Sequence, residues 1–207
     1  MEYFLPILFF VVSFFYSSVG LGGGSSYTAI MAIMGINYQI IPATSLTLNL
    51  GVTFIGMINF WKAGYGRINL VAPFLITSIP MSYLAGSVQL PELIFEIILI
   101  MTLILVISRI YFIDRLAFIY HLSNIEKWLL AIFLGSFLGF IAGAVGIGGG
   151  IYLVPLIIMF GLGTTKEASA AGATFIWFNS FAGLIPRLQS GTYDTKFITP
   201  LVFAVLL

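Results

Sequence analysis

Long stretches of the chain contain no charged residue, and short segments rich in glycine, proline and charge separate them. The charge-free stretches are residues 3–61, 68–91, 128–165, 168–186 and 197–207. Their apolar residues run continuously instead of alternating with period two, which favours membrane helices over a transmembrane β-barrel. Because a helix needs about 20 apolar residues to cross the hydrocarbon, the pattern predicts these helices: about 3–19, 43–61, 68–88, 92–113, 128–145 and 168–186, with another beginning near 196.

Two shorter apolar segments, at about 25–35 and 151–161, follow the glycine clusters Gly20–Gly24 and Gly146–Gly150. At about 1.5 Å per residue, each segment would reach only about halfway across the hydrocarbon. We therefore expect two half-helices that begin at helix breaks inside the membrane.

The chain also contains an internal repeat. The cluster Gly20–Gly24 returns 126 positions later as Gly146–Gly150, and Gly64-x8-Pro73 returns 127 positions later as Gly191-x8-Pro200. Such duplication is common in transporters. We predict a first transmembrane repeat at 1–108, a polar linker at 109–127 and a second transmembrane repeat at 128–207. Only seven residues follow Pro200, so we expect the second repeat to be incomplete at its C-terminal end, through truncation.

The predicted fold class is an all-α integral membrane protein, in which each repeat combines a glycine-broken half-helix segment with about three transmembrane helices. If each glycine segment dips in and returns, the second repeat is inverted relative to the first. If each glycine segment counts as one crossing, the repeats are parallel. The distribution of Lys and Arg slightly favours parallel repeats, whereas helix length favours inversion, which we prefer. Both alternatives place the 109–127 linker in the cytoplasm.

The composition agrees with a multi-pass protein of the cell membrane. Apolar residues make up 60% of the chain and charged residues only 7%, against about 25% charged residues in a soluble domain. This excludes a soluble enzyme, and the net charge of +1 gives no attraction to nucleic acid. With no Cys and the single His121, we expect neither a metal nor a cofactor. The expected partners are the lipid bilayer and a small anionic substrate, and the chain could also form a homo-oligomer.

Glycine clusters within membrane segments expose backbone N–H groups, and a half-helix that begins there points its positive dipole end at the break. This makes an anion site without charged side chains; the alternative is that the glycines only allow helices to pack closely. Ser25 and Ser26 would add hydroxyl donors. Polar residues of the following helices would either bind the substrate or bond a neighbouring helix. Among them, Asn49 and Asn179 lie at similar depths in the corresponding helices of the two repeats. The candidate substrate-binding residues are Gly22, Gly23, Gly24, Ser25, Ser26, Asn49, Gly148, Gly149, Gly150, Thr174 and Asn179.

Basic residues lie at the borders of the predicted helices. They are Lys62, Arg67, Arg187 and Lys196. They could guide anions to the pore, but we prefer to interpret them as anchors that set the topology.

The signature Gly-x-Gly-Gly-Gly, followed by a short apolar helix and then an Ala/Thr/Ser-rich helix, occurs twice. Its closest match is Gly-Ile-Gly-Gly-Gly-Ile-Tyr-Leu-Val-Pro-Leu at 146–156. In these features the chain resembles the TauE/SafE family of sulfite-exporter-like permeases, also called the 4-toluene sulfonate uptake permease family. The resemblance implies a secondary transporter for sulfur-containing or other small organic anions, such as sulfite or sulfonates, and not an enzyme.

Two other functions are weighed against transport. A non-transporting membrane subunit would not need paired helix breaks in mid-membrane. An intramembrane serine hydrolase would need a base beside Ser25 or Ser26, and the sequence offers no clear candidate for that base.

Overall fold

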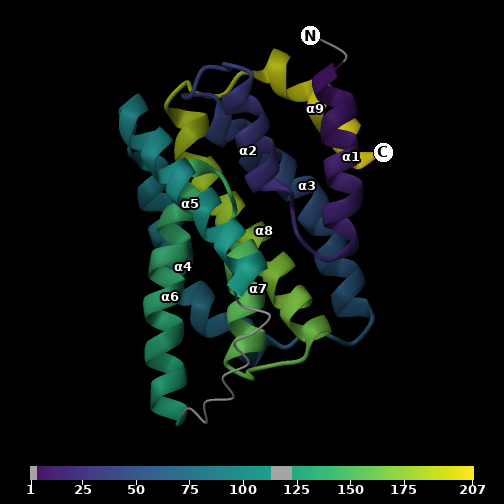
Figure 1. Cartoon of the computed structure of the whole chain (residues 1–207), viewed down its shortest axis with the longest axis vertical. Coiled ribbons are helices and arrows are strands. Elements are labelled where there is room, and N and C mark those ends of the chain that lie inside the picture. Colours follow the sequence, from purple (N-terminus) through teal and green to yellow (C-terminus); the bar gives the residue numbers. More distant parts are fainter. Residues whose placement is uncertain (1–3, 113–122) are drawn as a thin grey trace.

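Helices form the secondary structure of residues 4–112 and 123–207, the parts of the chain that the computed structural model describes (Figure 1). In chain order they are α1 (Phe4–Ser18), α2 (Gly24–Ile33), α3 (Ile41–Lys62), α4 (Ile68–Ser87), α5 (Glu92–Phe112), α6 (Asn124–Val145), α7 (Gly150–Met159), α8 (Thr165–Gln189) and α9 (Thr195–Leu206). The prediction of an all-α protein is confirmed for these residues.

Each predicted helix has a counterpart, and the differences have local causes. The two predicted half-helices are α2 and α7, with ten residues each. Helix α8 begins earlier than predicted because Thr164 and Glu167 form a capping box around its first turn. Residues 109–112 and 124–127 belong to α5 and α6. The rest of the predicted linker, with Asp114, Arg115 and His121, lies largely outside the described residues.

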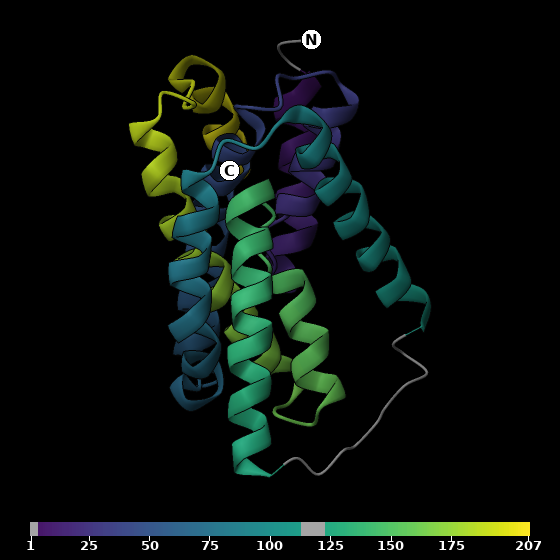
Figure 2. The same cartoon turned by 90° about the vertical axis from the view of Figure 1, so that its left-hand side faces the viewer.

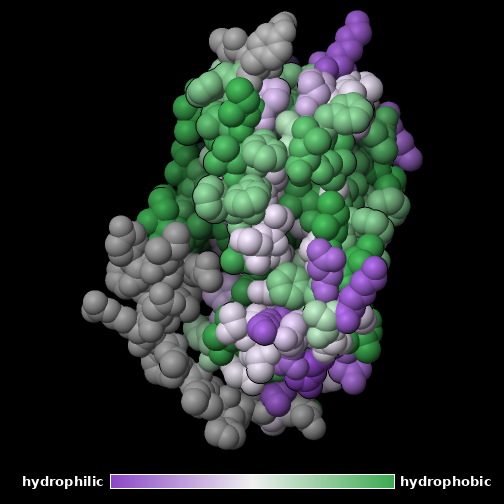
Figure 3. All heavy atoms as spheres, turned by 90° about the vertical axis from the view of Figure 1, so that its right-hand side faces the viewer, coloured by the Kyte–Doolittle hydropathy of each residue, from purple (hydrophilic) through white to green (hydrophobic). Residues whose placement is uncertain are grey.

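The distribution of apolar and polar side chains is that of a membrane protein. Within the described residues, four helices are long and apolar enough to span a membrane: Ile41–Lys62, Ile68–Ser87, Ile125–Val145 and Thr165–Gln189. Large apolar side chains such as Phe133 (70% exposed) cover the outside, whereas Asn49 and Asn179 are fully buried. Figure 3 shows hydrophobic residues over much of one face, with hydrophilic residues in its lower part and some at its upper edge. The described helices therefore form a multi-pass membrane protein.

Small residues join α4, α6 and α8 into one block. A side chain at Gly139 or Gly143 on α6 would collide with the backbone of Ser78 or Ser82 on α4, and Gly86 is equally close to the carbonyl of Gly183 on α8. Contacts this close bring helix backbones together in membranes. Because the contacts advance in the same direction along all three helices, α4, α6 and α8 are parallel, and Figure 2 shows α4 beside α6 along much of their length.

The half-helices α2 and α7 extend from the interior towards opposite ends of the molecule. Tyr38 and Gln39, which follow α2, line a cavity with Thr192, at the end where α8 finishes. Gly161 and Leu162, which follow α7, line another cavity with Arg67, where α4 begins. The N-termini of α2 and α7 consequently lie in the interior, each next to its glycine cluster.

The backbone turns at matching glycines in the two halves, although Gly148 has a positive φ and its counterpart Gly22 does not. Four pairs of glycines, 126 or 127 positions apart, share a positive φ. They are Gly20 and Gly146, Gly23 and Gly149, Gly35 and Gly161, and Gly64 and Gly191. The two halves of the chain thus turn at matching positions.

Candidate functional site

Each half-helix begins at a glycine that other residues would not readily replace. Gly23 precedes α2 with φ 79° and Gly149 precedes α7 with φ 72°. This left-handed conformation costs an L-residue roughly 1–2 kcal/mol. Neither N-cap has a side-chain hydrogen bond, so the first turns keep backbone donors for another partner.

Unbonded N–H groups remain at both breaks. In α2 the first amide with an acceptor is that of Ser26, which donates to the carbonyl of Gly23. Within residues 4–112 and 123–207, the N–H groups of Gly24 and Ser25 find no acceptor. In α7 the amide of Gly150 donates to Gly148, but that of Ile151 has no acceptor in the same part of the chain. Two helix N-termini with free donors therefore lie in the protein interior.

Helix α3 links the two breaks. The hydroxyl of Ser45 lies 2.8 Å from the carbonyl oxygen of Gly146 and 3.2 Å from that of Gly24. One turn further on, the side-chain amide of Asn49 donates to the same oxygen of Gly146 over 3.4 Å. One face of α3 thus contacts both glycine clusters, which the sequence separates by 126 positions.

Asn49 occupies the space that the glycines leave. A β-carbon added to Gly22 or Gly24 would collide with the Asn49 side-chain amide, and one added to Gly148 would lie 3.1 Å from its nitrogen. The oxygen Oδ1 of Asn49 is buried and has no donor among the described residues. This oxygen is an acceptor, so Asn49 can bind an anion only through Nδ2, which donates to Gly146 in this structure.

The break at Gly146–Gly150, which is the second one along the chain, is lined by different residues from the first break at Gly20–Gly24. Gly148 and Gly150 face the side chain of Ile176, and Gly150 also approaches the carbonyl of Gly172. Ile176 follows Asn49 by 127 positions, the same interval that separates Gly64 from Gly191. Ile176 is therefore the spatial counterpart of Asn49, a place that the sequence pattern had suggested for Asn179.

Three candidate residues contact neighbouring helices instead of the breaks. Asn179 donates to the hydroxyl of Ser78 and to the carbonyl of Phe175. Thr174 accepts a hydrogen bond from the indole of Trp61, and Ser26 donates to the hydroxyl of Tyr16. The other candidates are buried and lie in or directly beside the breaks. They are Gly22, Gly23, Gly24, Ser25, Asn49, Gly148, Gly149 and Gly150.

Arg187, interpreted from the sequence as a topological anchor, is buried in the structure. It is only 6% exposed and donates through Nη2 to the carbonyls of Gly143 (2.8 Å) and Ala144 (3.0 Å) at the end of α6. Its Nε is buried without an acceptor in the described residues. The four-residue spacing of Asn179, Gly183 and Arg187 is the signal in the sequence, because it places all three on one face of α8.

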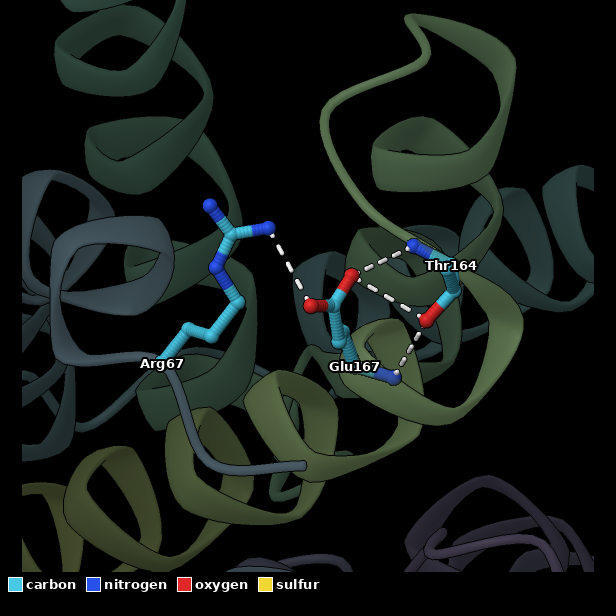
Figure 4. Close-up of polar contacts among 3 residues, drawn as sticks. All are labelled: Arg67, Thr164 and Glu167. Carbon is cyan, nitrogen blue, oxygen red and sulfur yellow. Dashed lines mark hydrogen bonds and ion pairs between the residues drawn. The ribbon is translucent and has the colours of Figure 1, made fainter. Parts of the chain in front are cut away.

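Each end of the molecule has a cavity with a basic residue. At one end a cavity of about 330 Å³ is lined by Arg67 and Lys127. Arg67 also pairs with Glu167 over 3.1 Å, and Glu167 accepts hydrogen bonds from Thr164 (Figure 4). At the other end a cavity of about 210 Å³ is lined by Arg187. Between them, the closely packed breaks separate the two cavities.

A multi-pass helical protein with broken helices in its interior and basic cavities at both ends has the architecture of a membrane transporter. The chain belongs to the family described as Sulfite exporter TauE/SafE, which it matches over residues 5–207. It is 37% identical over 203 residues to the Probable membrane transporter protein y4hK of Sinorhizobium fredii (strain NBRC 101917 / NGR234). The matched region covers 97% of this chain and 82% of that relative. No solved structure matches the chain. The resemblance found in the sequence is thus confirmed, and the chain is a member of a membrane transporter family.

Proposed function

We propose that this protein is a secondary transporter, a permease or exporter, for small sulfur-containing or organic anions such as sulfite or sulfonates. One observation carries the proposal: two half-helix N-termini, with unbonded N–H groups, lie in the interior beside the same face of α3. Their dipoles and donors stabilise an anion without a counter-ion. A site without a fixed cation also releases the anion again, which transport requires.

In this proposal the anion binds between the glycine clusters. Backbone N–H groups within Gly22–Ser26 and Gly148–Tyr152 hold it, first of all the unbonded ones of Gly24, Ser25 and Ile151, and Asn49 adds a directional hydrogen bond. Because Asn49 fills the space between the glycines, its side chain moves aside as the anion enters. Thr174 and Asn179 take part only if their present bonds to Trp61 and Ser78 break during transport.

The proposed topology is a pair of inverted repeats at 1–108 and 128–207, joined by the linker 109–127. The matching glycine conformations and the opposite directions of α2 and α7 support it. Lys166 donates to Tyr65, and Arg67 and Lys127 line one cavity, so these basic residues share an end of the molecule. By the excess of Lys and Arg at cytoplasmic loops, that end and the linker face the cytoplasm of a cell membrane. The cavities at the two ends then open in turn to the anion site.

Transport assays with purified protein in proteoliposomes test the function. Uptake and efflux of labelled sulfite, taurine, sulfoacetate and thiosulfate are measured against protein-free liposomes. We expect at least one of these anions to cross in a saturable, protein-dependent manner. If none crosses in either direction, with or without an imposed proton or sodium gradient, the proposed function is wrong.

A further inference from the structure

The cavity of about 210 Å³ beside Arg187 has a polar lining that the proposed central site does not use. We name it the Arg187 cavity. Besides Arg187 its polar lining residues are Tyr38, Gln39, Gln89 and Thr192. They come from the loops after α2, α4 and α8, so the cavity lies at the end opposite Arg67 and Lys127. Among the described residues, no acidic side chain lines it.

The charge of Arg187 is only partly balanced by the protein. The guanidinium donates to two carbonyls at the C-terminal end of α6, where the helix dipole amounts to about half a negative charge. Among the described residues Arg187 has no ion pair, and its Nε has no acceptor. Removing a cation from water is costly without a counter-charge. Arg187, which is 6% exposed, therefore brings to the cavity a positive charge that no described carboxylate pairs with, and an unused donor at Nε.

The cavity is separated from the second glycine break by one layer of residues. Pro42 and Ala144 line it, and the backbone of Pro42 packs against Gly146. The carbonyl of Gly146 is the one that Ser45 and Asn49 contact. An anion held by Arg187 is thus next to the region where the two half-helices begin.

We infer that the Arg187 cavity is a binding site for a small oxyanion, a sulfonate or sulfite group, whose oxygens accept hydrogen bonds from the guanidinium. The planar donor pattern of arginine suits such groups. The inference that an anion binds in the cavity rests only on the residues of the cavity. Its role, as the site through which the anion reaches the glycine breaks from this end, rests on the proposed function.

Cysteine labelling tests the site without requiring transport. The chain contains no cysteine, so Gln89→Cys introduces a single thiol at the exposed rim of the cavity. Its reaction rate is measured with an anionic and a cationic methanethiosulfonate reagent of similar size. We expect Arg187→Gln to lower the anionic-to-cationic rate ratio by about tenfold, as a charged cleft concentrates counter-ions about that much. The matched control Lys196→Gln, a basic residue exposed at the start of α9, is expected to change the ratio less than about twofold, because solvent screens an exposed charge.

Protection by an added anion tests binding itself. With Arg187 present, sodium methanesulfonate is expected to slow the labelling of Gln89→Cys more than sodium gluconate at equal ionic strength, and Arg187→Gln should remove this difference. Arg187→Lys retains the charge and should therefore retain the rate ratio. This variant, together with gel filtration of each variant, controls for misfolding. Equal labelling in methanesulfonate and gluconate overturns the anion site, even if the rate ratio changes.

Transport separates this inference from the proposed function. If the wild-type protein moves an anion and Arg187→Gln lowers its uptake at least about tenfold while Lys196→Gln does not, the role of the cavity in transport is supported. Transport that Arg187→Gln leaves unchanged refutes that role and leaves the proposed function standing. Protection by methanesulfonate in a protein that transports nothing supports the site and refutes the function.

Discussion

The two glycine breaks share a left-handed residue before each half-helix but differ in what surrounds them. Gly23 and Gly149 have nearly the same left-handed φ, and α2 and α7 have the same length. Ser45 and Asn49 of α3 are polar and contact both breaks, whereas Ile176 of α8 is apolar and faces the second break. The glycines determine where the half-helices α2 and α7 begin. The side chains of the helices that follow them, α3 and α8, determine which polar groups lie beside the breaks. The side-chain hydrogen bonds of the proposed site therefore come mainly from one half of the protein.

The same contrast occurs further along α3 and α8. Phe60 packs against Gly20 at the first break. Arg187, 127 positions later, bonds the carbonyls of Gly143 and Ala144 just before the second break. At the corresponding positions, an aromatic ring thus packs beside the first break and a cation lies beside the second. Matching backbones joined to unequal side chains can give the two ends of a transporter different affinities for the same anion.

The largest expected effect tests what the two breaks share. Gly23→Val and Gly149→Val should each abolish transport, because a β-branched residue disfavours positive φ. Its β-carbon would also lie 2.9 Å from the ring of Tyr27 or of Phe175. Transport in proteoliposomes is measured at equal membrane levels.

Gly35→Ala is the matched control for these valine variants. Gly35 has φ 71° but nothing within 4 Å of an added β-carbon. It should cost roughly 1–2 kcal/mol of stability and leave transport intact. Normal transport by both valine variants would show that the glycines only pack helices.

The next effect tests the difference between the breaks. Asn49→Leu should weaken substrate binding by about 1–3 kcal/mol, the usual loss of a hydrogen bond to a charged group. Ile176→Val, at the corresponding place, should change affinity little and cost about 0.5–1.5 kcal/mol of stability. The apparent KM for transport and the thermal unfolding of each variant are compared. Equal losses of affinity would mean that α3 and α8 contribute equally.

A smaller effect on affinity is expected at Asn179. Its side-chain amide donates to the hydroxyl of Ser78 and to the carbonyl of Phe175, and Ser82 donates to its backbone carbonyl, so the residue joins α8 to α4. Asn179→Leu should lower thermal stability by about 1–3 kcal/mol, because it leaves buried partners unsatisfied, while the apparent KM stays close to the wild type. A large rise in KM without loss of stability would instead place Asn179 in the substrate site.

The smallest effect is expected for the ion pair at the linker end. The side chain of Arg67 is 53% exposed and its bond to Glu167 is 3.1 Å long. An exposed pair contributes only about 0–1 kcal/mol. Arg67→Gln should therefore unfold close to the wild-type temperature, in contrast with Arg187→Gln. A large loss of stability in Arg67→Gln would show that this end is more tightly packed than the contacts indicate.

The sequence predicted the helices well, since long charge-free apolar runs and glycine clusters are local signals. It placed both half-helices within a few residues, because three neighbouring glycines interrupt a helix in any context. It did not predict that Ile176 faces the second break. The best local match for Asn49 was Asn179, and only packing between distant helices distinguishes the two. The burial of Arg187 was missed for the same reason, because its partners lie more than 40 positions earlier in the chain.

The hydroxyl of Ser45 has a further consequence for movement. It lies between the carbonyls of Gly24 and Gly146, but a hydroxyl has one hydrogen and donates to only one acceptor at a time. If the two breaks move apart, the serine can stay bonded to either of them, and the number of its hydrogen bonds does not change. The bond to Gly146 joins the two halves, whereas a bond to Gly24 lies within the first half. Ser45 can therefore release the second half without losing its own hydrogen bond, by turning its hydroxyl from one carbonyl to the other.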